Sequence, residues 1–540
     1  MSARVTAPSP RHAPEAHADV CLLLEGTYPY VRGGVSSWVR QLIENVPELS
    51  FSIVFLGATR EDDRGLAFEL PDNLVHLEVH ALLEPAPPLP APSSAAPPRL
   101  APVRAATRAK ACPHAGGDRF AASAHLHERL ADPDARATPE LAALATALLA
   151  GPCRILEDEL HHGRDAWEAL LGHYRAAPPG LDFNHWFWTV RGMHAPLFAL
   201  ARIAADPPRA SLYHSVSTGY AGFLGAMLQS ATGAPYLISE HGIYTKEREL
   251  DLGQVDWIPE PADPFGIGTG DELGHLRTLW IRFFRSLGRL AYARADRIFT
   301  LHEGNRRRQV ADGAPPERLE IVPNGVDVAR FARVRRADDA PVPPVLALIG
   351  RVVPIKDIKT FVRTMRIVRE RIPHAEGWLV GPQDEDPAYT EECVRLAASL
   401  GLEGAVKFLG FRRPEEIFPA TGLSVLTSVS EGQPLVTLEG FAAGVPTVTT
   451  DVGGCAELVR GLGPEDRALG AAGAVVPIAD PAAFAEAAIA LLSDRAAWGR
   501  ARAAGIARVE RHYDERDMVR RYREAWTMRI GPARTADRAA

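Results

Sequence analysis

The sequence has little cysteine and no long apolar run, and each absence excludes a class of protein. Its five cysteines are scattered and none stands in a CxxC pair, so we expect neither a disulfide framework nor a structural zinc site. Nowhere do about 18 apolar residues follow one another, so no membrane span is predicted. Residues 1–20 lack the apolar core of a secretory signal. Together these absences predict a cytoplasmic protein.

An excess of positive charge is also absent. The formal net charge is −7 at pH 7, which gives no support to a nucleic-acid binder. What is present is the composition of a globular protein, 46% hydrophobic and 24% charged. A chain of 540 residues is too long for one hydrophobic core, so we expect two or more domains.

The first half of the sequence has the pattern of an α/β domain. Val20–Gly26 and Phe51–Ala58 are apolar runs typical of buried strands, and a glycine loop and an amphipathic helix separate them. This order of elements opens a doubly wound α/β domain, which we assign to residues 19–335. Residues 1–18 are predicted to be a disordered lead, and the Pro/Ala-rich residues 84–139 a flexible insertion.

A second α/β series follows a polar, Pro-rich segment near residue 335. Short strands of Val, Leu and Ile alternate with helices, which predicts a second parallel sheet in a domain of residues 336–510. A last helix, 511–530, comes after this sheet has ended, and residues 531–540 are expected to be disordered.

A long amphipathic helix is predicted near the end of the first domain, from about Asp271 to Ala295. Its apolar residues recur at helical spacing, and its other side carries Arg282, Arg285 and Arg289. A core-facing helix with a solvated basic face explains this pattern. Contact of the basic face with an anionic membrane surface or a partner is the alternative.

Two cations follow the strand VLALIG of the second domain. Arg351 comes directly after it and Lys356 five residues later, both in a strand-to-helix loop. Ligands of open α/β sheets bind outside the carboxyl ends of the strands, and a diphosphate needs cations at such a place. A solvated charged loop is the alternative, since loops are commonly charged.

The segment SEGQPLVTLEG follows another strand of the same domain. Pro434 is suited to be the first helical residue, which leaves the N–H groups of Leu435 and Val436 free to bind an anion such as phosphate. Glu431 precedes this helix and Glu439 lies inside it, and ionised carboxylates accept hydrogen bonds from hydroxyl-rich ligands. The alternative is an ordinary helix start whose acids only favour the helix dipole.

The first domain offers a glycine pair and a histidine. Gly33 and Gly34 precede a helix after the first strand, where glycine lets a ligand approach the backbone; a tight turn is the alternative. His241 follows the strand PYLIS, where a structural histidine is the commoner case.

Several strings taken together resemble the GT-B glycosyltransferases of family 4. GRVVPIKDIKTFV, VPNGVD and SEGQPLVTLEGFAAGVPTVTTDVGGCAELV carry the likeness, and Glu431 and Glu439 form the E-x7-E hallmark of that family. In the first domain, EGTYPYVRGGVSSWV, YHSVSTGYAGFLGA, EHGIYTKERE and LWIRFFRSLGRLAYARADRI are similar to the family members of Pel exopolysaccharide biosynthesis. The Pro/Ala-rich insertion departs from the family's compact pattern.

The resemblance implies a GT-B fold: two Rossmann-like doubly wound domains that face each other across a cleft, with a C-terminal helix crossing back to the N-terminal domain. It implies a retaining hexosyltransferase that moves sugar from a UDP-sugar to a growing exopolysaccharide, with no cofactor and no required metal. UDP-glucose is the favoured donor and UDP-N-acetylhexosamine the next. Membrane-embedded synthesis and export partners, and a peripheral place at the inner face of the membrane, are also implied.

Roles for single residues follow from the same resemblance. Arg351 and Lys356 hold the donor diphosphate and stabilise the leaving group. Glu439 binds the ribose hydroxyls, and Glu431 contacts the donor sugar.

In the first domain the resemblance implies that His241 faces the donor sugar near the reacting carbon. Gly33 and Gly34 then pack against the phosphates or the acceptor.

Other motifs are weaker. GIGTG (Gly266–Gly270) has no strand before it, so it is not a dinucleotide fingerprint. The D-x-D match Asp384–Asp386 is predicted to be a solvated loop, and no metal site is expected. His125–His127 and the pair 161–162 are predicted to lie at the surface.

Two other functions stay open. One is a phosphorylase or epimerase on the same fold. The other is a non-catalytic module that binds a nucleotide-sugar and regulates a polysaccharide machine.

Overall fold

The protein is described here from a computed structural model. The described residues are 17–59, 65–83, 120–132, 137–149, 155, 157–177, 181–254 and 274–530. Their contacts divide them into two compact units. The first unit comprises described residues of 1–299, 309–319 and 528–540, and the second comprises 300–308 and 320–527.

The first unit is built on a seven-stranded sheet in the order β3-β2-β1-β4-β5-β6-β7. The strands are β1 (Ala18–Glu25), β2 (Phe51–Gly57), β3 (Leu74–Ala81), β4 (Ala210–Ser215), β5 (Tyr236–Glu240), β6 (Arg297–Thr300) and β7 (Leu319–Ile321). Strand β1 runs parallel to both β2 and β4. The strand order reverses between β1 and β4, and ligands of doubly wound sheets bind at such a switch point.

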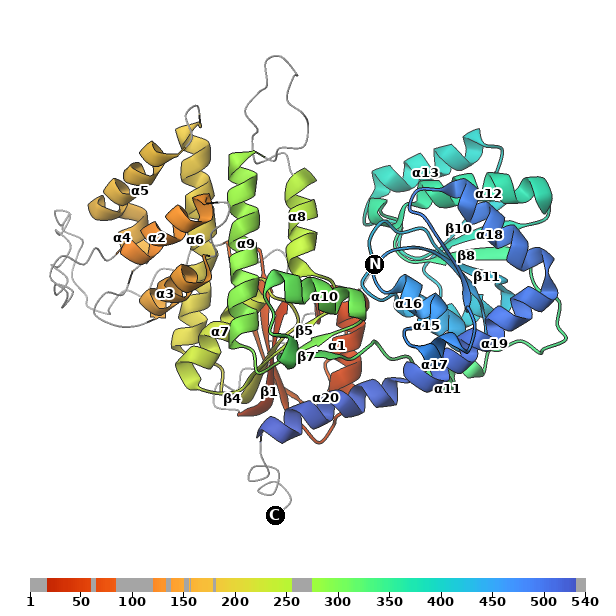
Figure 1. Cartoon of the computed structure of the whole chain (residues 1–540), viewed down its shortest axis with the longest axis horizontal. Coiled ribbons are helices and arrows are strands. Elements are labelled where there is room, and N and C mark those ends of the chain that lie inside the picture. The colour runs from red at the N-terminus through yellow and green to blue at the C-terminus, as the bar shows by residue number, and fades with distance from the viewer. Residues whose placement is uncertain are drawn as a thin grey trace, which may run out of the picture. The chain divides into compact units, whose positions relative to one another are not determined.

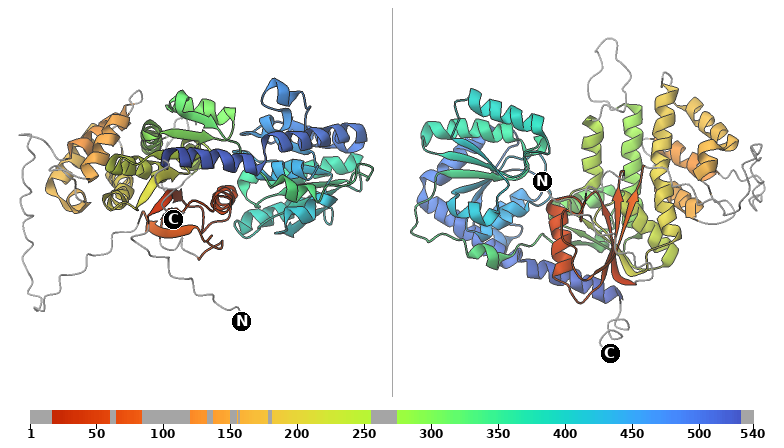
Figure 2. Two further views of the ribbon diagram at one scale, coloured as in Figure 1. Left: turned by 90° about the horizontal axis from the view of Figure 1, so that it is seen from below. Right: turned by 180° about the vertical axis from the view of Figure 1, so that it is seen from behind.

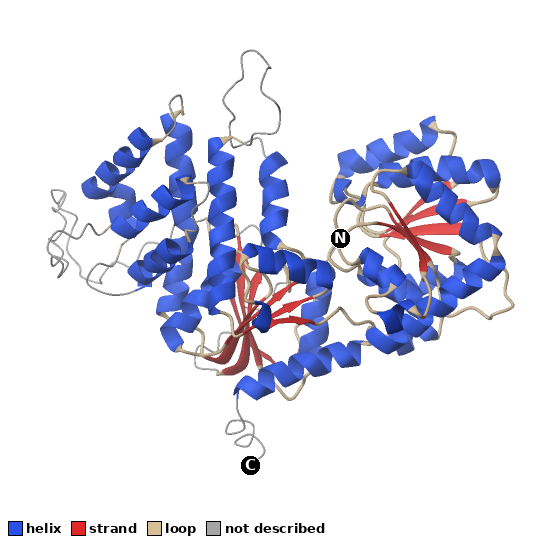
Figure 3. Ribbon diagram, viewed as in Figure 1, coloured by secondary structure: helices blue, strands red, loops and turns tan. Residues whose placement is uncertain are grey.

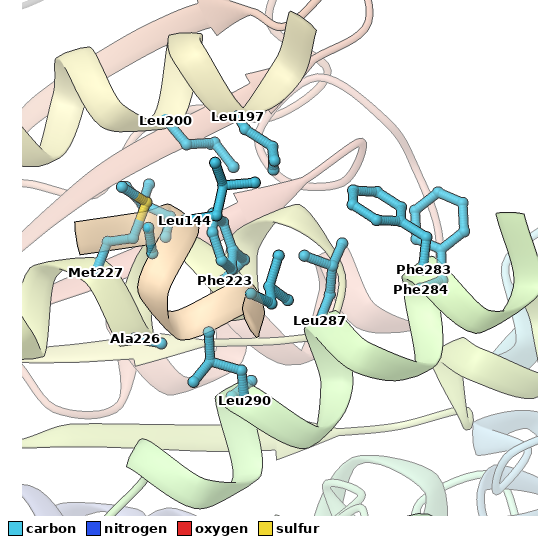
Figure 4. Close-up of a cluster of buried hydrophobic side chains, with 14 of the residues drawn as sticks. Leu144, Leu197, Leu200, Phe223, Ala226, Met227, Phe283, Phe284, Leu287 and Leu290 are labelled. Atoms are coloured by element: carbon cyan, nitrogen blue, oxygen red, sulfur yellow. The ribbon is translucent and has the colours of Figure 1, made fainter. Parts of the chain in front are cut away.

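Helices cover this sheet, and a group of them gathers beside one long helix. The helices are α1 (Gly34–Glu44), α2 (Ala121–Ala131), α3 (Thr138–Leu149), α4 (Glu157–His162), α5 (Arg164–Ala176), α6 (Phe183–Ala205), α7 (Tyr220–Thr232), α8 (Tyr244–Gln254), α9 (His275–Arg294) and α10 (Glu303–Asp312). Helices α2 to α5 lie beside α6 (Figures 1 and 2). The core is continuous between these helices and the sheet. Leu144 of α3, Leu197 of α6, Phe223 of α7 and Leu287 of α9 point toward one another (Figure 4).

Part of the predicted flexible insertion is ordered. Helix α2 lies inside the range 84–139, and its Leu126 and Leu130 are buried in the core. The sequence there changes from Pro-rich text to AASAHLHERLA, which has no proline and spaces its apolar residues for a helix. His127, predicted to be at the surface, is only 8% exposed for the same reason. Four predicted segments lie outside the described residues: the insertion up to residue 119, the GIGTG motif, the lead before residue 17 and the tail after residue 530.

The arginines on the basic side of helix α9 are partly exposed, and each also bonds to a neighbouring helix. The Arg282 guanidinium donates to the carbonyls of Leu130 and Ala131, at 2.8 and 2.9 Å. Arg285 pairs with Glu249 at 2.9 Å, and Arg289 donates to the Asp312 carbonyl at 3.1 Å. These arginines therefore join α9 to α2, α8 and α10. The pattern in the sequence could not show this, because all three partners lie far away along the chain.

The second unit is a six-stranded sheet in the order β10-β9-β8-β11-β12-β13. The strands are β8 (Val345–Ile349), β9 (Glu376–Val380), β10 (Val406–Gly410), β11 (Leu423–Leu426), β12 (Thr447–Thr450) and β13 (Gly473–Val476). All of its strand pairs are parallel. The order reverses between β8 and β11, so the two loops that follow these strands meet at the switch point of this sheet.

Helices lie on both sides of this second sheet (Figure 3). They are α11 (Val328–Ala332), α12 (Ile358–Arg371), α13 (Pro387–Ser399), α14 (Pro414–Ile417), α15 (Leu435–Ala442), α16 (Cys455–Arg460), α17 (Pro464–Arg467), α18 (Pro481–Ser493), α19 (Arg495–His512) and α20 (Glu515–Ile530). The last predicted helix is thus α20, and its residues from Met528 onward group with the first unit. No helix in the described part of the chain is long and apolar enough to cross a membrane.

Candidate functional site

Lys356 is placed by a short loop at the carboxyl end of β8. Residues Pro354–Lys356 form one turn of 3₁₀-helix, and Asp357 follows in the left-handed conformation, with φ 43°. The Asp357 carboxylate then accepts from the Thr360 amide at 3.2 Å and caps α12. The side chain of Lys356 thus leaves the chain at a fixed point between strand and helix.

Lys356 forms an ion pair with Glu431. Its ammonium lies 2.5 Å from Glu431 Oε1, and the two side chains are only 19% and 13% exposed. Two further bonds join the same segments: the Val429 amide donates to the Ile355 carbonyl at 2.9 Å, and the Thr427 hydroxyl to the Lys356 carbonyl at 2.8 Å. The loops after β8 and β11 therefore meet at the switch point.

Helix α15 begins one residue later than predicted. Pro434 is its N-cap, with φ −71° and ψ 118°, and Leu435 is the first helical residue. The Thr437 amide makes the first turn's bond, to the Pro434 carbonyl at 3.2 Å. The amides of Leu435 and Val436 have no hydrogen-bond partner within the described residues. They stand at the positive end of the helix dipole, where an anion is favoured.

Glu439 is partly buried in the second turn of α15. Burial raises the pKa of its carboxyl to about 7; the nearby Glu415 acts in the same direction and Arg330 against it. A carboxyl in this state both donates and accepts hydrogen bonds near neutral pH. It can therefore hold a diol such as that of a ribose.

Arg351 lies apart from the Lys356–Glu431 pair. Its guanidinium binds Glu385 at 2.5 Å, and both side chains are nearly half exposed. Glu385 is the middle residue of the D-x-D match, so that residue serves in an ion pair. The last residue of the match, Asp386, caps α13: its carboxylate accepts a hydrogen bond from the Tyr389 amide at 2.9 Å. Among the described residues no group of three or more His, Cys, Asp or Glu side chains is arranged to hold a metal ion.

Sequence reasoning missed two loops that support Glu431. The Asn324 amide donates to Gln433 Oε1 at 2.7 Å, and its side-chain amide to the Gln433 carbonyl at 3.0 Å. Gly453 has φ 51°, and a Cβ built on it would lie 2.0 Å from the Glu431 carbonyl oxygen. The signals were present as the turn sequences PNG and GG, but neither tells which distant loop it contacts.

His241 lies at the carboxyl end of β5 in the first unit and is 9% exposed. Its ring packs edge-on against Trp38, with centroids 4.5 Å apart, and burial lowers its pKa to about 4. The imidazole is therefore neutral at pH 7.

Glu240 precedes His241 and is 1% exposed. Its carboxylate accepts four hydrogen bonds, from Thr218, the Tyr244 amide, Tyr292 and Gln309. These bonds fix the end of β5, and with it the loop that carries His241.

Gly33 and Gly34 begin helix α1, as its N-cap and its first residue. A Cβ built on either glycine would meet nothing within 4 Å, so the space beside both is open. Neighbouring atoms therefore impose no steric need for glycine at either position. The predicted site residues thus fall into two sets: the two glycines and His241 belong to the first unit, and the others to the second.

Comparison with known proteins agrees with this division. Residues 18–317 match the family described as "Domain of unknown function (DUF3492)", and residues 343–494 match the family described as "Glycosyl transferases group 1". The chain has the fold class of the GT-B glycosyltransferases, two Rossmann-like units with parallel sheets. By the match over its N-terminal part, the protein belongs to the DUF3492 family.

Curated relatives are D-inositol 3-phosphate glycosyltransferases. The protein of Nocardia farcinica is 33% identical over 217 residues, 38% of this chain and 46% of its own length. That of Acidothermus cellulolyticus is 28% identical over 312 residues, 54% of this chain and 63% of its own length. The chain therefore spans about half the length of the curated relatives it matches.

Two solved structures share the fold over most of the chain. HepE from Anabaena, in complex with UDP and glucose, has a TM-score of 0.54 and 14% identity, and the match covers 94% of this chain and 99% of that one. Sucrose-phosphate synthase from Thermosynechococcus elongatus has a TM-score of 0.52 and 18% identity, with 94% and 98% covered.

Proposed function

We propose that the protein is a retaining glycosyltransferase that transfers a sugar from a UDP-sugar. The partly buried Lys356–Glu431 pair beside the open amides of α15 carries this proposal. A nucleotide-sugar presents a diphosphate and two sets of hydroxyls. The second unit offers a cation and helix amides for the first, and the carboxyls of Glu431 and Glu439 for the second.

The chemistry divides among these groups as follows. The bond between the anomeric carbon and the β-phosphate oxygen breaks, and UDP leaves with the electron pair. The Lys356 ammonium and the amides of Leu435 and Val436 stabilise the negative charge that develops on phosphate. The acceptor hydroxyl bonds to the anomeric carbon on the same face, and its proton passes to the departing phosphate. Arg351 is held by Glu385 and joins the diphosphate only if that ion pair opens.

The first unit supplies the acceptor side in this proposal. His241 is neutral and held against Trp38, so it can bind a sugar hydroxyl without adding charge near the reacting carbon. Gly33 and Gly34 leave room for a phosphate or an acceptor at the start of α1.

UDP-glucose is the favoured donor, with UDP-N-acetylhexosamine next. The likeness to HepE, a protein solved with UDP and glucose, supports a uridine nucleotide. The acceptor is proposed to be a growing exopolysaccharide of the Pel type, on the strength of the N-terminal motifs. The protein would then work in the cytoplasm, at the inner face of the membrane with membrane-embedded synthesis and export partners, and without a metal.

A donor panel tests the proposal. Purified protein is incubated with UDP-glucose, UDP-N-acetylglucosamine and UDP-N-acetylgalactosamine, and UDP release is measured with and without an oligosaccharide acceptor. We expect acceptor-dependent UDP release that survives EDTA, and an α-linked product by NMR because these donors are α-linked. Strict dependence on added Mn²⁺ would contradict metal independence. Phosphate-dependent glucan cleavage or interconversion of UDP-sugars would favour a phosphorylase or an epimerase, and UDP-sugar binding without turnover would favour a regulator.

A further inference from the structure

His302 belongs to the short segment between β6 and α10, and it lies beside the glycine turn of the proposed donor site. In the second unit, a Cβ built on Gly454 would lie 3.1 Å from His302 Cδ2. The neighbouring Gly453 contacts the Glu431 carbonyl, and the Gly454 amide donates to the Gly432 carbonyl at 2.7 Å. The His302 ring therefore packs against the same glycine turn that contacts the Glu431 loop.

The hydrogen bonds of His302 define its tautomer. Burial lowers its pKa to about 4, so the ring is neutral at pH 7. Its Nδ1 accepts a hydrogen bond from the Asn305 amide at 3.3 Å. A ring nitrogen that accepts carries no proton, so the proton resides on Nε2, which is a donor.

This donor lacks an acceptor. His302 is 2% exposed, and its Nε2 has no hydrogen-bond partner among the described residues. A buried donor without a partner destabilises the folded state, and a ligand that accepts a hydrogen bond from it removes that cost. The Gly453 amide, on the turn next to the ring, also makes no hydrogen bond within the described part of the chain.

The segment that carries His302 is held in place by a separate carboxylate. Glu457 of α16 accepts from the amides of Glu303 and Gly304, each at 3.3 Å, and so occupies the start of helix α10. An anionic ligand therefore cannot use that helix end, and the free donors left beside the glycine turn are His302 Nε2 and the Gly453 amide.

We propose that His302 Nε2 donates a hydrogen bond to a phosphate oxygen of the nucleoside diphosphate at the Gly453–Gly454 turn. The inference rests on the proposed function, because it adds one residue to the same donor site. A neutral N–H group can donate a hydrogen bond to a phosphate oxygen without adding a charge to the site. A Cβ at Gly454 would lie 3.1 Å from Cδ2 and 3.3 Å from Cγ of His302, so glycine at this position lets the ring pack against the turn.

Binding measurements on variants test this. His302→Phe keeps the shape of the ring and removes the N–H, whereas His302→Gln places an amide N–H near the position of Nε2. His374→Phe, at an exposed histidine of the same unit, is the matched control. UDP affinity is measured by calorimetry, and uridine binding, which involves no phosphate, by NMR titration.

We expect His302→Phe to weaken UDP binding about ten- to a hundredfold and to leave uridine binding unchanged. His302→Gln should retain most of the UDP affinity, and His374→Phe should match the parent. Wild-type UDP affinity in His302→Phe, or an equal loss for UDP and uridine, overturns the inference while the proposed function stands.

If the parent protein binds no uridine nucleotide, the proposed function fails, and the role of His302 with it. If the Phe variant does not fold, the comparison moves to His302→Gln and His302→Asn. The Asn amide is too short to reach the Nε2 position, so equal UDP affinity in these two variants also overturns the inference.

Discussion

The ammonium of Lys356 lies 2.5 Å from Glu431 Oε1, and this pair joins the two loops at the switch point of the second sheet. Because both side chains are largely buried, neither charge is well solvated, and each depends on the other. A diphosphate that binds here meets a cation already held in place, and the carboxylate is positioned for the hydroxyls of a sugar. The pair is thus both a structural contact and the centre of the proposed chemistry.

Removing either member of the pair should abolish most of the sugar transfer. For Lys356→Ala and Glu431→Ala we expect kcat to fall at least about 10²–10³-fold, because charge stabilisation on the leaving phosphate or contact with the donor sugar is lost. Lys407→Ala is the control, since Lys407 pairs with Glu376 on the surface at 2.7 Å. Turnover of either active-site variant at the parent's rate would disprove the assignment.

The same pair should show coupling in stability. Each single variant leaves one buried charge without its partner, so the double variant Lys356→Ala/Glu431→Ala should be less destabilised than the sum of the two. Thermal unfolding of the four proteins measures the coupling. Simple additivity would mean that the ion pair opens in solution.

The pKa of Glu439 predicts how stability changes with pH. Burial raises this pKa to about 7 in the folded protein, above the ordinary value of 4.5 for a glutamate. The folded state therefore binds more protons than the unfolded state between these two values, and this group lowers stability as pH rises through that window. Glu439→Gln removes the effect. We expect the variant to gain in melting temperature relative to the parent at pH 8 and to gain less at pH 5.

The control for this experiment is Glu416→Gln, at an exposed glutamate of the second unit. It should track the parent at both pH values. A Glu439→Gln variant whose gain is the same at pH 5 and pH 8 would show that the carboxyl titrates normally.

The order of strands and helices could be predicted from the sequence, because it depends on the pattern of apolar and turn residues over short stretches. Apolar runs such as Phe51–Ala58 and turn residues such as Pro434 specify elements over a few positions, and the structure moves their bounds by only one or two residues. The E-x7-E spacing likewise placed Glu431 before α15 and Glu439 inside it. Such features involve residues close together in the chain, so the spacing of residues in the sequence predicts them.

Contacts over long sequence separations were not open to prediction. Nothing in the sequence near Arg351 indicates that its guanidinium pairs with Glu385, which lies 34 residues away. The bond from Asn324 to Gln433 spans 109 residues, and the positions of His302 and Glu457 depend on how β6 and β12 end in space. Such pairs depend on the register and packing of whole elements, and a single sequence carries no local signal for them.

The glycine turn beside Glu431 gives a fourth prediction. A Cβ at Gly453 would lie 2.0 Å from the Glu431 carbonyl oxygen, and the backbone there has φ 51°, which L residues rarely adopt. Gly453→Ala should therefore displace the Glu431 loop and lower kcat/KM for the donor about tenfold or more. Gly463→Ala is the control, because a Cβ there meets nothing within 4 Å. Equal kcat/KM values for the two variants would show that the turn is not coupled to the site.

A fifth prediction concerns the buried ion pair of Arg508 and Asp466, which fixes helix α19 in the second unit. Arg508 is fully buried, and its Nε donates to Asp466 Oδ1 at 2.6 Å. Its other nitrogens donate to the carbonyls of Leu458, Val459, Asp466 and Gly470. Every side of the guanidinium therefore has an acceptor.

Replacing Arg508 by Met should leave the Asp466 carboxylate and four carbonyls without their donor, at a cost of about 3–5 kcal/mol. Urea unfolding should show this as a large fall in the midpoint, whereas Arg500→Met, at an exposed position of the same helix, should change stability by less than about 0.5 kcal/mol. Adding Asp466→Ala to Arg508→Met should recover part of the loss, because the uncompensated charge is removed. A Met variant as stable as the parent would mean that the apolar packing around α19, rather than this ion pair, holds the helix on the sheet.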